Sequence, residues 1–90
     1  MEFEWDENKS RANQAKHGID FNAATELWHD ENQVEVQTTF PSEKRSILIG
    51  RIGKKLWVAI FTRRENAIRI ISVRRAKDKE TKLYEQEKIG

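Results

Sequence analysis

The sequence contains no cysteine, so neither a disulfide bond nor a thiolate metal site can stabilise the chain, and a reducing compartment is favoured. The longest uninterrupted apolar run is LWVAIF, which is far too short to span a bilayer. The first residues, MEFEWDENK, are acidic and hold no apolar stretch, so we expect no secretory signal. These absences predict a cytoplasmic protein with no membrane partner.

Motifs for cofactor chemistry are also missing. The glycines in HG and GRIGKK do not form a phosphate-cradling loop. His17 and His29 stand without an HExxH motif or a carboxylate cluster, so we expect no metal site and no cofactor. Ser72 lacks the strand–turn–helix elbow of an acyl-transfer nucleophile.

Charge is abundant but unevenly divided. Residues 1–40 hold three basic and nine acidic residues, a net charge of −6, whereas residues 41–90 hold fourteen basic and six acidic residues, a net charge of +8. Arg74 and Arg75 close the otherwise apolar stretch IISV, where each guanidinium needs water or an anionic partner. The second half therefore favours nucleic acid or another polyanion as its partner. The alternative is a solvated surface with charge complementarity between helices and sheet.

Ninety residues allow one small domain over residues 1–90, and the residue pattern predicts an α+β fold. Asp6 and Asp20 are expected to cap two N-terminal helices, the first of which ends at Gly18. The FEW stretch is either a short strand or an apolar anchor. A period of two predicts the strands of an antiparallel meander, followed by a polar helix over residues 77–88, with the strands at residues 34–39, 45–52, 56–62 and 67–74. Residues 40–44 contain the single proline and are expected to turn the chain.

Strict alternation in the last strand predicts which side chains share a face. It places four residues on one face, Ile68, Ile70, Ser72 and Arg74. It places the other four on the opposite face, Arg69, Ile71, Val73 and Arg75. Arg74 and Arg75 are therefore expected to point in opposite directions. Arg69 is expected to be a solvated or ion-paired strand residue.

Two further positions are candidates for chemistry. His17 follows Lys16 at a helix C-terminus, where the helix dipole favours a protonated imidazole that can exchange a proton with a ribose or phosphate oxygen. The alternative is that both are ordinary helix-end residues. Tyr84 lies on the polar C-terminal helix, where it either anchors the helix or stacks on a base. Trp5, Trp28 and Trp57 fall on apolar faces and are expected to be core residues.

Three stretches of the sequence, FEWDENKSRANQAKHGIDF, ILIGR and AIRIISVRRAKDKETKLYE, resemble the BrnT family of bacterial type II toxins. The family pattern has a W-D-x-x-K start, a K-H-G turn, an I-G strand and an I-S-A-R strand followed by a Y-E helix. The resemblance implies a RelE-like fold, in which two N-terminal helices pack on a small antiparallel sheet with a C-terminal helix. Arg63, Val73 and Ser46 depart from the family pattern.

The resemblance also implies an activity. BrnT toxins are metal-independent endoribonucleases that cut RNA and arrest translation, and a BrnA antitoxin neutralises them and carries the contact to operator DNA. Carried over by position, the catalytic candidates are Lys16, His17, Arg45, Arg64, Arg74 and Tyr84. The arginines Arg45, Arg64 and Arg74 are expected to gather over one hollow and hold the scissile phosphate. Other basic residues of the second half are candidates for contacts to RNA, namely Arg51, Lys54, Lys55, Arg63, Arg69 and Arg75.

Two other classes of function fit the same charge pattern. A non-catalytic nucleic-acid-binding module would explain the basic half and would tolerate loss of His17. A protein-interaction adaptor would use the basic half as an interface for an acidic partner.

Overall fold

A computed structural model describes residues 1–38 and 44–89 of the chain. The elements along it are β1 (Glu2–Glu4), α1 (Glu7–His17), α2 (Phe21–Ala24), the 3-10 helix η1 (Thr25–His29), β2 (Val34–Gln37), β3 (Ser46–Ile52), β4 (Lys55–Arg64), β5 (Ala67–Arg75) and α3 (Asp78–Ile89). The predicted α+β class is confirmed. Most of the proline-containing turn predicted for residues 40–44 lies outside the described residues.

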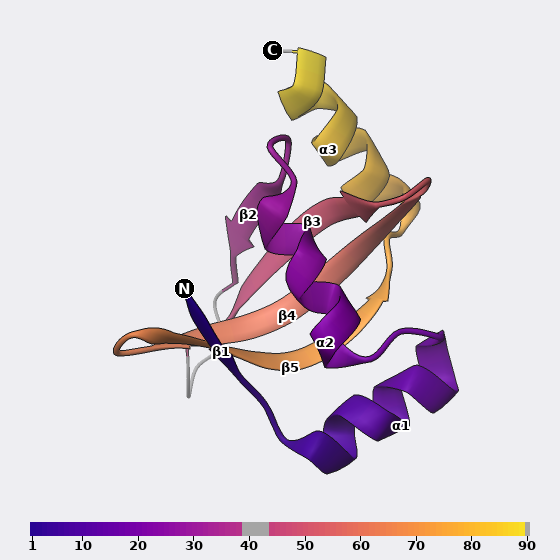
Figure 1. Cartoon of the computed structure of the whole chain (residues 1–90). Helices are drawn as coiled ribbons and strands as arrows, with labels where there is room; N and C mark the ends of the chain where they lie inside the picture. Colours follow the sequence, from indigo (N-terminus) through magenta and orange to yellow (C-terminus); the bar gives the residue numbers. More distant parts are fainter. Residues whose placement is uncertain (39–43, 90) are drawn as a thin grey trace.

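The five strands form one sheet in the order β1-β5-β4-β3-β2 (Figure 1). Strands β2 to β5 pair antiparallel in succession, as the short loops predicted, and β4 lies at the centre. β1 pairs parallel with β5, so that Glu2 lies opposite Ala67. The expectation of a wholly antiparallel sheet is therefore wrong at this edge. Parallel neighbours need a long connection, and here residues 5–66 supply it.

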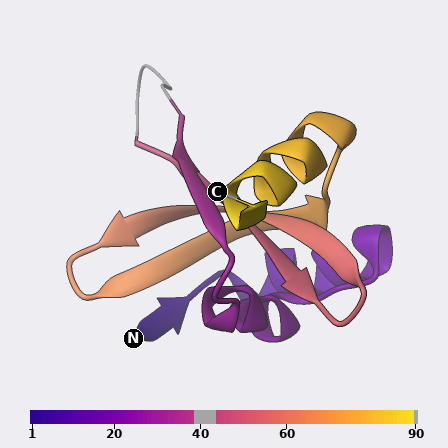
Figure 2. The same cartoon turned by 90° about the horizontal axis from the view of Figure 1, so that it is seen from above.

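The sheet carries helices on both faces, with α1 and α2 on one side and α3 on the other (Figure 2). The larger core fills the side of α1 and α2 with Ile19, Phe21, Ala24, Leu27, Leu48, Trp57, Ala59, Phe61, Ile68, Ile70 and Val73. Trp5 and Trp28 pack against it, so all three tryptophans contribute to the core as predicted. The smaller core lies beneath α3 and centres on Ile49, Val58 and Tyr84.

Helix α1 begins and ends at the predicted capping residues. The Asp6 side chain accepts hydrogen bonds from the Asn8 and Lys9 amides at 2.8 and 3.3 Å. Gly18 adopts φ 80° and donates its amide to the Gln14 carbonyl, a left-handed cap that suits glycine. The first of the two predicted N-terminal helices therefore lies where the cap residues place it.

Two buried polar side chains attach α1 to the rest of the molecule. The Asn13 amide donates to the carbonyls of Ile19 and Val73 at 2.8 and 2.9 Å, and its oxygen accepts from the Val73 amide at 3.1 Å. Ser10 Oγ accepts from the Phe21 amide at 2.9 Å. Asn13 thus supplies hydrogen-bond partners to the backbone at the edge of β5, beyond the point where the pairing with β1 ends.

An irregularity between β4 and β5 changes which side chains share a face. Ile60 pairs with Ser72, but the next residue, Phe61, pairs with Ile70, so Ile71 is left without a partner in β4. Beyond this bulge Val73 joins the larger core, and Arg74 lies opposite Val58 on the side of α3. The face predicted for Ser72 and Arg74 is therefore wrong, because strict alternation does not hold across a bulge. Arg69, Ser72 and Arg74 share one face.

Candidate functional site

A basic pocket lies on the face of the sheet that carries α3. Helix α3 crosses part of this face, and the part near the β4–β5 hairpin carries no helix (Figure 2). The pocket has a volume of about 180 Å³ and is lined by Lys9, Arg45, Thr62, Arg64, Arg69 and Ile71. Four of these six side chains are cationic, and no acidic residue is found among the described residues that line it. The arrangement suits a polyanion.

Four separate segments of the chain bring the cations of the basic pocket together. Lys9 lies in the first turn of α1, and Arg64 is the last residue of β4. Arg69 lies on β5 opposite Thr62 of β4, and Arg45 comes directly before β3. The expected convergence of Arg45 and Arg64 is therefore observed.

Two threonines hold the segment that carries Arg45. The amide and the hydroxyl of Thr38 both donate to the Arg45 carbonyl, at 3.0 and 2.8 Å. Thr62 Oγ1 donates to the Lys44 carbonyl at 3.0 Å. These bonds fix the backbone at the entrance to β3, so the Arg45 side chain starts from a defined point beside the pocket.

The cations of the pocket differ in their existing partners. Arg69 Nη1 lies 3.3 Å from Glu4 Oε2, in a pair whose side chains are 32% and 42% exposed. Such a solvated pair is weak, so a phosphate can compete for the guanidinium. The Arg64 side chain is exposed and makes no ion pair or hydrogen bond with any residue that the structure describes.

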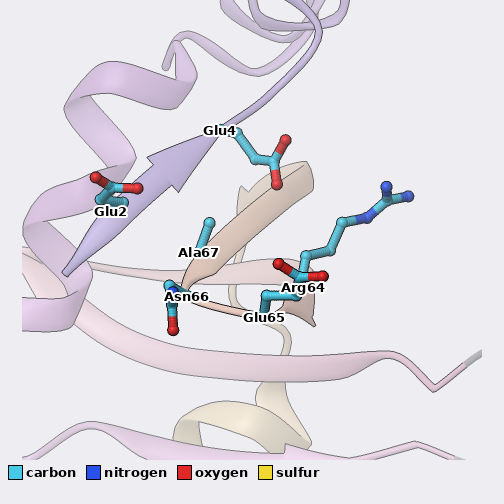
Figure 3. A pocket seen from close by; sticks show the side chains of 6 residues that line it. All are labelled: Glu2, Glu4, Arg64, Glu65, Asn66 and Ala67. Atoms are coloured by element: carbon cyan, nitrogen blue, oxygen red, sulfur yellow. The ribbon is translucent and has the colours of Figure 1, made fainter.

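A larger neighbouring pocket, of about 530 Å³, has the opposite character. It is lined by Glu2, Glu4, Arg64, Glu65, Asn66 and Ala67. In Figure 3 Glu2 and Glu4 project from β1, while the Arg64 guanidinium extends away from the turn that carries Glu65. The three carboxylates of this larger pocket repel a phosphate, so the basic pocket is the better candidate for an anionic ligand.

Arg74 is on the same face as the basic pocket but does not line it. Its pairing partner, Val58, is four residues from Thr62 along β4, a separation of about 13 Å. Arg74 forms a bidentate ion pair with Glu80 of α3, in which Nη1 donates to Oε1 at 2.8 Å and Nη2 donates to Oε2 at 2.7 Å. The hydrogen bonds from Arg74 outweigh burial and hold the pKa of Glu80 below its usual value, and they raise the pKa of Arg74. The expectation of one hollow for all three arginines does not extend to Arg74.

Tyr84 anchors α3 to the body of the molecule. Its side chain is buried, with 1% exposure, and its hydroxyl donates to Asp30 Oδ2 at 2.8 Å. Burial and this hydrogen bond raise the pKa of Tyr84. Burial alone would raise the pKa of Asp30, but hydrogen bonds from the Asn32 and Arg51 amides and from Tyr84 bring it below its usual value. The geometry favours the anchoring role over base stacking.

Lys16 and His17 lie at the opposite end of α1 from Lys9. His17 follows Lys9 by eight residues, a distance of about 12 Å along a helix. Lys16 is exposed and His17 is half-buried, and neither lines the basic pocket.

Of the further RNA-contact candidates, only Arg69 lines the basic pocket. Arg63 points to the opposite face, where it pairs with Glu35 at 2.7 Å. Arg75 stacks 5.4 Å from the Trp57 ring, and Arg51 lies 5.6 Å from the Tyr84 ring. Lys54 and Lys55 are exposed at the β3–β4 turn.

Lys9 was not predicted as a site residue. The signal that could have identified it is its place as the lysine of the W-D-x-x-K stretch, one turn after the N-cap of α1. The contact between the start of α1 and β5 cannot be read from local sequence, because it depends on how the helix packs.

No group of three or more His, Asp or Glu side chains within residues 1–38 and 44–89 is arranged to hold a metal ion. Across the same residues no helix combines the length and the apolar character needed to cross a membrane.

Comparison with protein families decides the class of protein. The family model for BrnT, the ribonuclease toxin of type II toxin–antitoxin systems, matches residues 5–80. The chain belongs to the BrnT toxin family. It is therefore a ribonuclease toxin of a type II toxin–antitoxin system, and every residue of the basic pocket falls within the matched range. No curated protein matches the sequence.

Proposed function

We propose that this BrnT toxin is an endoribonuclease that cleaves RNA at the basic pocket without a metal ion and thereby arrests translation. The observation that carries the proposal is the convergence of Lys9, Arg45, Arg64 and Arg69 on one pocket without an acidic lining residue among those described. A phosphodiester in this pocket meets several cations at once, and this cationic surrounding is the electrostatic term that dominates nucleic-acid affinity.

The reaction in this proposal follows from RNA chemistry. The ribose 2′-oxygen gives its proton to water and bonds to the adjacent phosphorus, and the bond from phosphorus to the 5′-oxygen breaks as that oxygen gains a proton. The products are a 2′,3′-cyclic phosphate and a 5′-hydroxyl. Guanidinium groups stabilise the extra charge on the phosphorane, a role that would otherwise fall to a metal ion. We therefore expect cleavage to persist in a chelator such as EDTA, and loss of activity in EDTA would contradict the metal-independent mechanism.

Arg64 provides the sharpest test because its neighbour is a matched control. Arg63 precedes it in β4 and carries the same charge, but it points to the opposite face and pairs with Glu35. We expect Arg64→Ala to lower cleavage of a defined RNA by about 10²–10³-fold, the usual cost of removing one stabilising donor. Arg63→Ala is expected to change cleavage little. Equal losses in both variants would show that only net charge matters and would contradict a phosphate site in the basic pocket.

Lys9 is the only lysine among the described residues that line the basic pocket, and the other cations there are arginines, which stay protonated and serve poorly as proton donors. Within the proposal Lys9 donates the proton to the leaving 5′-oxygen. Lys9→Arg keeps the positive charge but removes the proton donor, so we expect RNA binding to persist while cleavage falls by about 10²-fold or more. If His17→Ala loses cleavage and Lys9→Arg does not, the donor is His17 instead.

The partner and the setting of the toxin are part of the same proposal. We infer that a BrnA-like antitoxin neutralises the chain in the cytoplasm and that the complex reaches operator DNA only through the antitoxin. The fold is proposed to be RelE-like. Expression of the toxin alone is expected to arrest bacterial growth with fragmented RNA, and co-expression of the antitoxin is expected to restore growth. RNA binding without fragmentation would instead support the non-catalytic module.

A further inference from the structure

The bulge in β5 creates a row of polar side chains across the sheet face that carries the basic pocket. Arg69 lies at the pocket, Ser72 pairs with Ile60, and Arg74 pairs with Val58. Arg74 is thus the next cation along the strand from the pocket on that face. An RNA strand whose phosphate occupies the pocket can reach Arg74 with another phosphate further along the strand.

The hydrogen bonds of Arg74 to described residues leave one edge of its guanidinium without a partner. Nη1 donates to Glu80 Oε1 and to the Arg75 carbonyl, at 2.8 and 3.2 Å, and Nη2 donates to Glu80 Oε2 at 2.7 Å. A guanidinium has five N–H donors, so Nε–H and the second Nη2 hydrogen remain. No residue within the described ranges accepts a hydrogen bond from Arg74 Nε. These two donors lie side by side and match the spacing of two phosphate oxygens.

Glu80 is itself held in place. Its Oε1 accepts a hydrogen bond from the Lys77 amide at 2.8 Å. Lys77 directly precedes α3 and Glu80 is the third residue of the helix, which is the arrangement of a capping box. The Glu80 side chain is 16% exposed, and the Arg74 side chain is 25% exposed. The carboxylate is therefore fixed to the start of α3, and the guanidinium is fixed to the carboxylate.

We propose that Glu80 is a positioning residue for RNA cleavage, because it orients Arg74 so that the free Nε and Nη2 edge binds a second phosphate of the RNA next to the basic pocket. The inference rests on the proposed function and extends it from one phosphate to two. It assigns α3 a part in substrate binding through Glu80, without any contact between Glu80 and RNA.

An argument from charge alone and the positioning role predict opposite effects of removing the Glu80 carboxylate on RNA affinity. Removing a carboxylate from a phosphate-binding surface raises the local positive potential and should strengthen RNA binding. The positioning role predicts weaker binding despite this gain, because the arginine fork loses its fixed orientation and must be ordered by the substrate. The sign of the change therefore discriminates between the two.

The experiment measures the cleavage rate, kcat/KM, on a short RNA and the affinity for the same RNA with non-cleavable 2′-methoxy groups, at several salt concentrations. Glu80→Gln keeps the cap on Lys77, since glutamine also serves at this helix position, but it breaks the charged fork to Arg74. We expect Glu80→Gln to lower both kcat/KM and affinity about tenfold, the usual effect of one lost charge-assisted hydrogen bond, with an unchanged salt slope. Arg74→Ala is expected to lower affinity similarly and to reduce the salt slope by about 0.7, the value for one phosphate contact on a single strand.

Leu83→Ala is the matched control for a loosened helix. Leu83 packs α3 onto the smaller core and, among the described residues, its side chain takes no part in the hydrogen bonds between Arg74 and Glu80. We expect Leu83→Ala to lower the melting temperature while leaving the RNA affinity of the folded protein unchanged. Unchanged or tighter RNA binding by Glu80→Gln would overturn the inference, as would equal losses of affinity in Glu80→Gln and Leu83→Ala. A wild-type chain that binds RNA without cleaving it contradicts the proposed function, whereas the binding comparison still decides the role of Glu80.

Discussion

Asn13 takes the place of a neighbouring strand with a single side chain. It is 7% exposed and makes three hydrogen bonds, two to the backbone of Val73 and one to the Ile19 carbonyl. We expect Asn13→Ala to lower the free energy of unfolding by about 2–3 kcal/mol, because buried backbone groups lose their partners. Urea unfolding measures this change. Asn22→Ala, at an exposed position of α2, serves as the control and should stay within about 0.5 kcal/mol of wild type.

Glu65 and Gly53 occupy corresponding positions in two hairpins, and each is the first residue of a two-residue turn. Gly53 has φ 62° and Glu65 has φ 42°, in the left-handed region that costs most residues about 1–2 kcal/mol. We expect Glu65→Gly to gain about 0.5 kcal/mol after the entropy cost of glycine, and Gly53→Ala to lose about 1 kcal/mol. A lower melting temperature for Glu65→Gly would show that its side chain has stabilising contacts that outweigh the backbone cost.

Individual residues were predictable where a local rule applies to them. The caps Asp6 and Gly18 follow from helix-end chemistry, and the structure confirms both. Asn13 and Lys9 were missed because the β5 residues beside them, Val73 and Arg69, are about sixty residues away in the chain. An asparagine inside a polar helix gives no local sign that it is buried.

Most strands and helices of the structure lie close to the residue ranges predicted from the sequence. The predicted strands, the first helix and the C-terminal helix are present within a residue or two at most ends, because period-two patterns and short turns are local signals. The second predicted N-terminal helix is instead divided into the four-residue α2 and the 3-10 helix η1. Two further misses at this scale share one cause. The parallel pairing of β1 and the bulge at Ile71 depend on how strands align with one another, and alternation along one strand contains no information on either.

Helix α3 is attached at two acidic residues, and its attachment should therefore depend on pH. Arg74 lowers the pKa of Glu80, and hydrogen bonds lower the pKa of Asp30, which accepts from Tyr84. A carboxyl group with a lowered pKa in the folded state stabilises that state above its unfolded pKa, about 4.3 for Glu and 3.9 for Asp. The stabilisation is lost as the pH falls below these values through the folded pKa.

We therefore expect the difference in melting temperature between wild type and Glu80→Gln to be present at pH 7 and to shrink as the pH falls below about 4.3, the unfolded value for Glu. Glu31→Gln, at an exposed position, is the control and should show little difference at either pH. A difference that persists unchanged at low pH would show that the Arg74–Glu80 pair contributes through packing alone.

At the scale of the whole molecule, the two faces of the sheet differ in character. The face of α1 and α2 contains the larger core, whereas the opposite face contains the basic pocket and the docked α3. The excess of positive charge in residues 41–90 predicted an anionic partner, and three of the four pocket cations come from that half. The sequence could not separate Arg74 from the pocket, because their distance is set by strand register.

The central claim is that the basic pocket holds the scissile phosphate, and a crystal structure of the toxin with a non-cleavable 2′-methoxy RNA tests it most directly. We predict one phosphate within hydrogen-bond distance of Arg64 and Arg69 and a second phosphate of the same strand at Arg74. RNA bound on the face of α1 and α2, or across the β3–β4 turn with the pocket unoccupied, would contradict the account.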